Sequence, residues 1–177
     1  MLQLSSEMSY NLYMQRILLV LRHGKSKWGE EFESDFERPL NKRGQRAAKF
    51  IGKHLKKQEL APDAIVTSPA ERAVSTAELI GARFELGELF LSKQIYHAGC
   101  STLLEVVAKL DDEWQTVLLV GHNPGLEELV DQLSGSRDTL LKTCSLAVLS
   151  VEADSWATAT DFKLEGLFHP RELMGEV

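Results

Sequence analysis

Short runs of consecutive apolar residues alternate along this chain with longer segments in which apolar residues recur at helical spacing. Runs such as ILLVL and VLLV contain no polar position, which is typical of strands buried on both faces of a sheet. The strands predicted on this basis are residues 16–21, 63–68, 93–96 and 116–120. Strands that alternate with helical segments in this way predict an α/β domain.

Four amphipathic segments lie between or after these strands. Asn41 and Ser68 are expected to cap the first two, Ser101 to open the third, and Asn123 and Pro124 to start the fourth. In the second segment, Ser68 is expected to cap the helix, Pro69 to occupy its first position and Glu71 to complete a capping box. Apolar residues then recur at a spacing of three and four, which predicts one buried face for each helix.

The C-terminal part of the chain changes character. The stretches SLAVLSVEA and ATATDFKLEGL, separated by residues 154–155, predict an antiparallel hairpin that closes the sheet. No internal repeat, linker or low-complexity segment interrupts the pattern. We therefore predict a single domain over residues 16–177, preceded by a flexible tail at residues 1–15.

Composition excludes several functional classes. With 177 residues, 44% of them apolar, the chain can bury a sizeable core. A net charge of −6 without a basic stripe argues against a nucleic-acid partner. No apolar run approaches the ~18 residues of a membrane span, and residues 1–16 lack the features of a signal peptide. We expect a cytoplasmic protein without a membrane partner.

The cysteines and several histidines have no spacing typical of a bound metal. Cys100 and Cys144 are too few and too far apart for a disulfide framework or a zinc cluster. His97 and His169 have no neighbouring residue at metal-ligand spacing. The sequence therefore predicts no metal site and no cofactor.

Candidate chemistry lies where the predicted strands end. The motifs RHG, TSPAER and GHNPG each follow a buried strand, and the carboxyl ends of such strands gather at one edge of an α/β sheet. Each motif alone is better explained as a helix cap, a turn or a solvated strand end. Together they bring two arginines and two histidines to one place: Arg22, His23, Arg72 and His122.

This set of side chains is suited to phosphoryl transfer. A guanidinium group binds phosphate oxygens through two parallel hydrogen bonds. The imidazole of His23, with an ordinary pKa of ~6.5, is available in its neutral, nucleophilic form. We expect His122 to act as a cationic partner, and the helix beginning at Pro124 to add backbone N–H donors.

Four stretches of the sequence also resemble a known family. RHG at 22–24, DFERPLNKRG at 35–44, SPAERAVSTAELI at 68–80 and VLLVGHNPGLEELV at 117–130 are similar to the histidine phosphatase (phosphoglycerate mutase-like) superfamily, and most similar to its small SixA-type phosphohistidine phosphatases. The resemblance spans roughly residues 16–168. It implies a three-layer α/β/α fold with a mixed, mostly parallel sheet.

The resemblance also implies roles for individual residues. His23 would be the phosphorylated residue, Arg22 and Arg72 the phosphate clamps, and His122 the second histidine of the pocket. The backbone N–H of Asn123 would be a further phosphate donor. The predicted catalytic set is therefore Arg22, His23, Arg72 and His122.

The chain departs from the family pattern at two places. Gly29 stands where many relatives have an asparagine that contacts phosphate, which removes that contact. Residues 83–100 are too few for the helical lid of larger relatives, so we expect an open site.

The loop after the nucleophile is rich in acidic residues. Asp35 is a candidate proton donor, although an acidic run is also typical of solvated surface. On the same loop, Trp28 is expected to be partly buried, with a place at the pocket rim as the alternative. Arg38 is expected to position the loop through a carboxylate.

These expectations lead to a functional hypothesis. The chain would remove a phosphoryl group from phosphohistidine on a protein of the histidine-phosphotransfer type, through a covalent phospho-His23 intermediate. Two alternatives stay open. One is a monoesterase acting on a small phosphorylated substrate, a sugar or nucleotide phosphate, and the other is a phosphate-recognition module without turnover.

Overall fold

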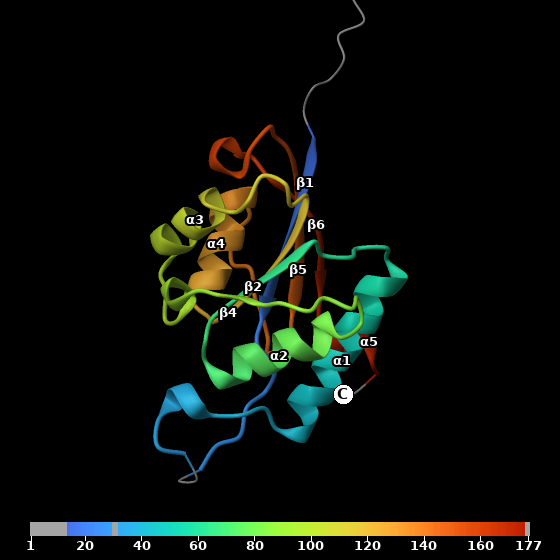
Figure 1. Cartoon of the computed structure of the whole chain (residues 1–177), viewed down its shortest axis with the longest axis vertical. Coiled ribbons are helices and arrows are strands. Elements are labelled where there is room, and N and C mark those ends of the chain that lie inside the picture. The colour runs from blue at the N-terminus through green and yellow to red at the C-terminus, as the bar shows by residue number, and fades with distance from the viewer. Residues whose placement is uncertain (1–13, 30–31, 176–177) are drawn as a thin grey trace, which may run out of the picture.

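The fold is built on one mixed sheet of six strands, in the order β3-β2-β4-β1-β5-β6. The computed structural model describes residues 14–29 and 32–175 (Figure 1). The strands are β1 (Gln15–Arg22), β2 (Ala64–Thr67), β3 (Phe90–Leu91), β4 (Thr116–Gly121), β5 (Leu146–Glu152) and β6 (Lys163–Phe168). Strand β5 runs antiparallel to both of its neighbours, and the remaining pairs are parallel. This confirms the predicted mixed, mostly parallel sheet.

Helices cover both faces of this sheet. They are α1 (Lys42–Lys57), α2 (Glu71–Gly81), α3 (Cys100–Ala108), α4 (Gly125–Ser134) and α5 (Pro170–Leu173). Helices α3 and α4 lie on one face, and α1, α2 and α5 lie on the other (Figure 1). The result is the expected three-layer α/β/α arrangement. No helix of the described residues is long and apolar enough to cross a membrane.

Side chains of β1 alternate between two apolar cores. Leu18 and Val20 join the core shared with α3 and α4, whereas Leu19 and Leu21 join the core shared with α1 and α2. All four side chains are fully buried. A strand in the middle of a two-faced sheet has no solvent side, which explains the uninterrupted apolar run seen in the sequence.

The start of β1 lies inside the predicted tail. Gln15 pairs with Glu152 of β5, and the carbonyl of Met14 accepts a hydrogen bond from the backbone N–H of Ala153. Residues 1–13 of the predicted tail lie outside the described residues.

The predicted third strand at residues 93–96 was wrong. The strand β3 lies earlier, at Phe90–Leu91, and Lys93–Ile95 form the short 3-10 helix η2. Ile95 is almost fully buried in the core shared with α3 and α4. The turn that directs this side chain inward takes the place of extended pairing.

The C-terminal hairpin is present, but its connection is longer than predicted. Residues 153–162 join β5 to β6 and include the 3-10 helix η3 (Trp156–Thr158). The Trp156 ring is buried in the core, and its indole N–H donates to the carbonyl of Trp114 at 2.9 Å. Burial of this large side chain takes the segment out of the sheet.

The register of the parallel strands brings their carboxyl ends level. Arg22 at the end of β1 lies beside Gly121 of β4, and Thr67 at the end of β2 lies beside Val120. The next residues stay in line, because the backbone N–H of His23 donates to the Gly121 carbonyl. Residues that follow these strands therefore emerge together at one edge of the sheet.

Helix α1 touches the loop after β1 at a glycine. The side chain of Asn41 caps the helix by accepting from the Gly44 backbone N–H at 2.9 Å, as predicted. A Cβ atom at Gly44 would lie 2.7 Å from the backbone nitrogen of Lys25 and closer still to its carbonyl oxygen. Backbone atoms cannot move aside as a side chain can, so this contact requires glycine.

We predict that Gly44→Ala destabilises the protein, although alanine is the better helix former. The overpacking should lower the free energy of unfolding by about 1–3 kcal/mol, measured by urea denaturation. The control is Gly87→Ala, where no atom lies within 4 Å of the added Cβ. An unfolding midpoint for Gly44→Ala equal to that of the control would show that α1 does not pack against this loop as described.

Candidate active site

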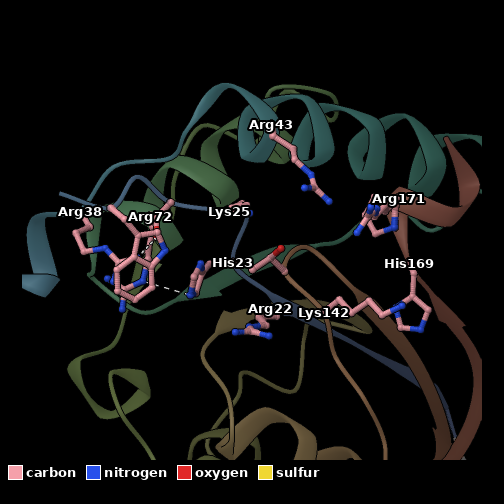
Figure 2. A pocket seen from close by; sticks show the side chains of 13 residues that line it. Arg22, His23, Lys25, Arg38, Arg43, Arg72, Lys142, His169 and Arg171 are labelled. Carbon is pink, nitrogen blue, oxygen red and sulfur yellow. Dashed lines mark hydrogen bonds between the residues drawn. The ribbon is translucent and has the colours of Figure 1, made fainter. Parts of the chain in front are cut away.

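The strand ends bring together the side chains singled out in the sequence. Arg22 and His23 follow β1, and His122 follows β4. Arg72 lies on the first turn of α2. His23, Arg72 and His122 are almost completely buried, and Arg22 is half-buried. Figure 2 shows His23 between the arginines that surround it.

The hydrogen bonds of His23 determine which of its ring nitrogens carries the proton. Nε of Arg72 lies 3.2 Å from Nε2 of His23. A guanidinium nitrogen only donates, so Nε2 must be the accepting, unprotonated nitrogen. Nδ1 then carries the hydrogen and donates to the carbonyl of Gly24 at 2.8 Å. The lone pair of Nε2 is therefore available on the side of Arg72.

Burial and charge keep the His23 ring neutral. Desolvation is the largest influence on its pKa, and the nearby charges of Arg72 and Arg22 act in the same direction, against the hydrogen bond to Gly24. Together they lower the pKa of His23 to about 4. At neutral pH this imidazole is uncharged, with a lone pair on Nε2.

Thr76 connects the loop of the nucleophile to α2. Its hydroxyl oxygen accepts from the Gly24 backbone N–H at 3.0 Å, and its hydroxyl donates to the Arg72 carbonyl at 2.6 Å. All three groups are buried. His23 and Arg72 are thus held in a fixed relation through one threonine.

His122 lies beside His23, with ring centroids 5.0 Å apart. Its Nε2 is 2.8 Å from the hydroxyl of Ser68. Desolvation first, then the neighbouring His23 and Arg72, lower the pKa of His122 to about 3. The expectation of a cationic His122 was therefore wrong for the unliganded protein, in which the ring is neutral at pH 7.

Ser68 is a site residue that the sequence analysis assigned to a different role. It was expected to cap α2, but the helix begins at Glu71 with Ala70 at its N-cap. The backbone N–H of Ser68 still donates to the Val120 carbonyl, as a continuation of β2. Its position at a strand end, in line with His122, is the signal that could have identified it.

Arg22 and Asn123 share one backbone acceptor. The Arg22 guanidinium and the Asn123 side-chain amide donate to the carbonyl of Leu141 at 2.8 and 2.9 Å. Burial lowers the pKa of Arg22, partly opposed by Glu127. The structure thus brings Asn123 beside Arg22, and its backbone N–H as a phosphate donor stays a prediction.

Two nitrogens of the site are buried without a partner among the described residues. They are Nε of Arg22 and Nδ1 of His122. A buried polar atom left unpaired costs about 1–3 kcal/mol, and such atoms call for an explanation such as a ligand. Together with the guanidinium groups, they make a site suited to a compact anion.

Asp35 forms an ion pair with the guanidinium of Arg72. Their ion pair measures 2.8 Å, and Asp35 also binds Arg38 at 2.6 Å. Desolvation acts to raise the pKa of Asp35, but the hydrogen bonds from Arg38 and Arg72 outweigh it and lower the pKa to about 2. Asp35 is ionised at neutral pH, so in this arrangement it holds no proton to donate.

Two further residues that the sequence analysis did not assign lie at the site. The Tyr96 hydroxyl donates to Asp35 at 3.2 Å, and Nε2 of His97 lies 3.7 Å from the same carboxylate. Their rings lie 5.4 and 6.1 Å from that of His122. His97 directly follows the strand predicted at residues 93–96, so the strand-end rule could have included it, whereas nothing local to Tyr96 indicates a place at the site.

A cavity of about 530 Å³ opens beside His23. Trp28 lies at its rim, 81% exposed, with the Arg38 guanidinium 4.0 Å from its ring. The partial burial expected for Trp28 was therefore wrong and the alternative, a place at the rim, holds; the contact of Arg38 with a carboxylate is confirmed. Residues 82–99 contain no α-helix that could act as a lid. Among the residues of the structure, no three His, Cys, Asp or Glu side chains form a group able to hold a metal ion.

Comparisons with known proteins show which family this chain resembles. The family model of the histidine phosphatase superfamily (branch 1) matches residues 18–94. An uncharacterized chloroplastic protein of Arabidopsis thaliana is 30% identical over 173 residues, covering 89% of this chain and 79% of that protein.

Two solved structures of proteins proposed to be SixA phosphohistidine phosphatases are also similar. The one from Nakamurella multipartitia is 27% identical with a TM-score of 0.77, covering 89% of this chain and 97% of that one. The one from Agrobacterium tumefaciens is 28% identical with a TM-score of 0.75, covering 88% and 98%.

We predict that His23 titrates far below an ordinary histidine. At pH 7 its ring should be the neutral Nδ1–H form, and as the pH falls it should gain a proton at Nε2 with a midpoint near 4. Long-range ¹H–¹⁵N correlation spectra measure both properties, and the signal absent from His23→Gln assigns the ring. A midpoint near ~6.5, or an Nε2–H form at pH 7, would contradict the arrangement.

We also predict that Asp35→Asn strengthens phosphate binding. Loss of the carboxylate frees the Arg72 guanidinium, so the Kd for inorganic phosphate should fall about three- to tenfold, roughly the energy of one partly exposed ion pair. Titration calorimetry measures this change, with Asp161→Asn as a control outside the site. In a phosphatase assay kcat should change little. A fall in kcat of about a hundredfold or more would instead support the role of Asp35 as a proton donor.

Proposed function

The chain belongs to the histidine phosphatase superfamily, and we propose that it is a phosphatase that removes phosphoryl groups from phosphohistidine on proteins. The observation that carries this proposal is the state of His23. Its ring is neutral, its Nδ1–H is held by the Gly24 carbonyl, and its Nε2 lone pair faces the anion site. A pure phosphate-binding module has no need of a nucleophile prepared in this way.

The first step transfers the phosphoryl group to the protein. Nε2 of His23 attacks phosphorus in line, the new P–N bond forms, and the bond to the leaving group breaks with its electron pair. Arg22 and Arg72 bind the equatorial oxygens and offset their charge. Arg72 exchanges its contact with Nε2 for one with the phosphoryl group, and Asp35 leaves the Arg72 guanidinium.

The second step returns the protein to its starting state. Water attacks the phosphorus of phospho-His23, and the electron pair of the P–N bond returns to Nε2. The proton of that water passes to the solvent, and inorganic phosphate leaves. The buried nitrogens of Arg22 and His122 are placed to bind the phosphoryl oxygens in both steps.

The leaving group supports phosphohistidine over a phosphate ester. An alkoxide needs a proton from a general acid, whereas an imidazole leaves with less help. Asp35 is ionised, and the pKa of Tyr96 is raised, by burial first and then by Asp35. The two similar structures at 27% and 28% identity are of proteins that are themselves proposed to be phosphohistidine phosphatases. The cytoplasmic location expected from the sequence stays a prediction.

A small phosphorylated substrate is the second candidate, favoured by the size of the cavity. About 530 Å³ lies within the range of ligand pockets and exceeds the space that one phosphoryl group needs. Kinetics on a panel would separate the two. A metabolite with a far higher kcat/KM than any phosphohistidine peptide would replace the first candidate.

We predict that His23→Gln abolishes turnover and labelling. Rapid quenching of the wild type with ³²P-labelled phosphohistidine peptide should trap an acid-labile, alkali-stable phosphoprotein, and the variant should carry none. Its kcat should fall at least about 10³-fold, as for loss of other catalytic nucleophiles. His54→Gln, a histidine change on α1 away from the site, should keep both properties. A folded His23→Gln protein with normal turnover would exclude the mechanism.

A further inference from the structure

The cavity beside His23 gathers positive charge in a chain that is acidic overall. Among the residues that the structure describes, the cavity is lined by no aspartate or glutamate but by seven lysine and arginine side chains: Arg22, Lys25, Arg38, Arg43, Arg72, Lys142 and Arg171. The whole chain carries a net charge of −6. Like charges collected in one recess repel each other and concentrate anions there. One transferred phosphoryl group needs only the part of this set that surrounds His23.

The cations divide into two groups around the nucleophile. Figure 2 shows Arg38 and Arg72 on one side of His23, and Arg43, Lys142 and Arg171 on the other. The second group comes from three separate elements, namely α1, the segment before β5, and α5. Their side chains converge on the same cavity from different parts of the sequence.

Arg43 lies at a position where a positive charge destabilises the fold. It belongs to the first turn of α1, a turn that contains no acidic residue. The positive end of the helix dipole lies there, and a basic residue at this position is unfavourable. An arginine that is half-buried at such a place, and that lines the cavity, is better explained by a ligand than by the helix.

We propose that the substrate carries a second anionic group, a phosphate or a carboxylate, and that Arg43, Lys142 and Arg171 bind it. This inference rests on the proposed function, because it assigns to the same substrate a second point of attachment in the same cavity. The group has two sources with one chemistry. It is an acidic side chain close to phosphohistidine on a protein, or the second phosphate of a small molecule.

The carboxylate of Glu172 moderates this subsite. Glu172 lies 2.9 Å from the Lys142 ammonium, with both side chains exposed. An anionic substrate group must compete with Glu172 for that lysine. Removal of the Glu172 charge should therefore strengthen binding at the subsite, whereas removal of Lys142 should weaken it.

The test compares substrates that differ only in the second charge. One pair is a phosphohistidine peptide flanked by glutamates and the same peptide flanked by glutamines. The other pair is fructose 1,6-bisphosphate and fructose 1-phosphate. In the wild type at low salt, kcat/KM should favour the more charged member of at least one pair about tenfold, as expected from two or three exposed charge contacts. Added salt should reduce this preference. The preferred pair identifies the source.

Matched variants locate the effect. Arg43→Gln/Lys142→Gln should reduce the preference to less than about twofold and leave kcat/KM for the less charged member within about twofold. The control Lys49→Gln/Lys53→Gln removes the same charge from exposed positions of α1 that do not line the cavity, and it should keep the preference. Glu172→Gln should increase it. The single variants Arg43→Gln and Lys142→Gln replace the double variant if that protein does not fold.

Two results would overturn the inference. The first is equal kcat/KM within both pairs, and the second is a preference that survives Arg43→Gln/Lys142→Gln. A protein without turnover would instead contradict the proposed function. In that case, calorimetric titration with propane-1,3-bisphosphonate and propylphosphonate decides the matter. Tighter binding of the bisphosphonate that the double variant loses supports the subsite, and equal binding rejects it.

Discussion

The site depends on the register of three parallel strands. Because Arg22 lies level with Gly121, and Thr67 with Val120, the residues that follow β1, β2 and β4 meet at one edge of the sheet. A slip of one residue in any of these strands would turn its side chains to the opposite face. The apolar cores on both faces prevent such a slip, because the side chains of residues 17–21 of the central strand pack alternately into one or the other. Packing energy far from the site thus holds His23 in place.

Desolvation then gives these residues their chemical properties. His23 and His122 are buried among guanidinium groups, so their neutral forms are favoured and their pKa values fall. The same burial makes the positive field of Arg22 and Arg72 stronger than it would be in water. Without a bound anion, the positive charge of these arginines would be uncompensated, and Asp35 supplies a compensating negative charge. The acidic loop is therefore part of the electrostatics of the site rather than solvated surface alone.

Much of this was accessible from the sequence, for a physical reason. Strand burial leaves a strong apolar pattern, so the ends of β1, β2 and β4, and with them Arg22, His23 and His122, could be predicted. Contacts across the sheet leave no such pattern. The pairing of Asp35 with Arg72, the neutral state of His122 and the contribution of Ser68 depend on distances between segments remote in the chain.

Local sequence patterns also failed to predict elements whose conformation depends on one buried side chain. The burial of Ile95 replaced a predicted strand by η2, and the burial of Trp156 lengthened the connection between β5 and β6. Short segments have little intrinsic preference, and one tertiary contact decides their conformation. Tyr96 and His97 were missed because their contacts with Asp35 join segments remote in the chain, which no local pattern records.

The Asp35 contact has a consequence for the end of the catalytic cycle. A carboxylate fixed to the same chain faces Arg72 at an effective concentration of about millimolar, as for other short tethers. It will therefore re-form its ion pair with Arg72 as soon as a weakly bound anion begins to leave. This competition shortens the time that the product phosphate stays bound. The carboxylate on this loop thus displaces phosphate and leaves the site ready for the next phosphorylated substrate.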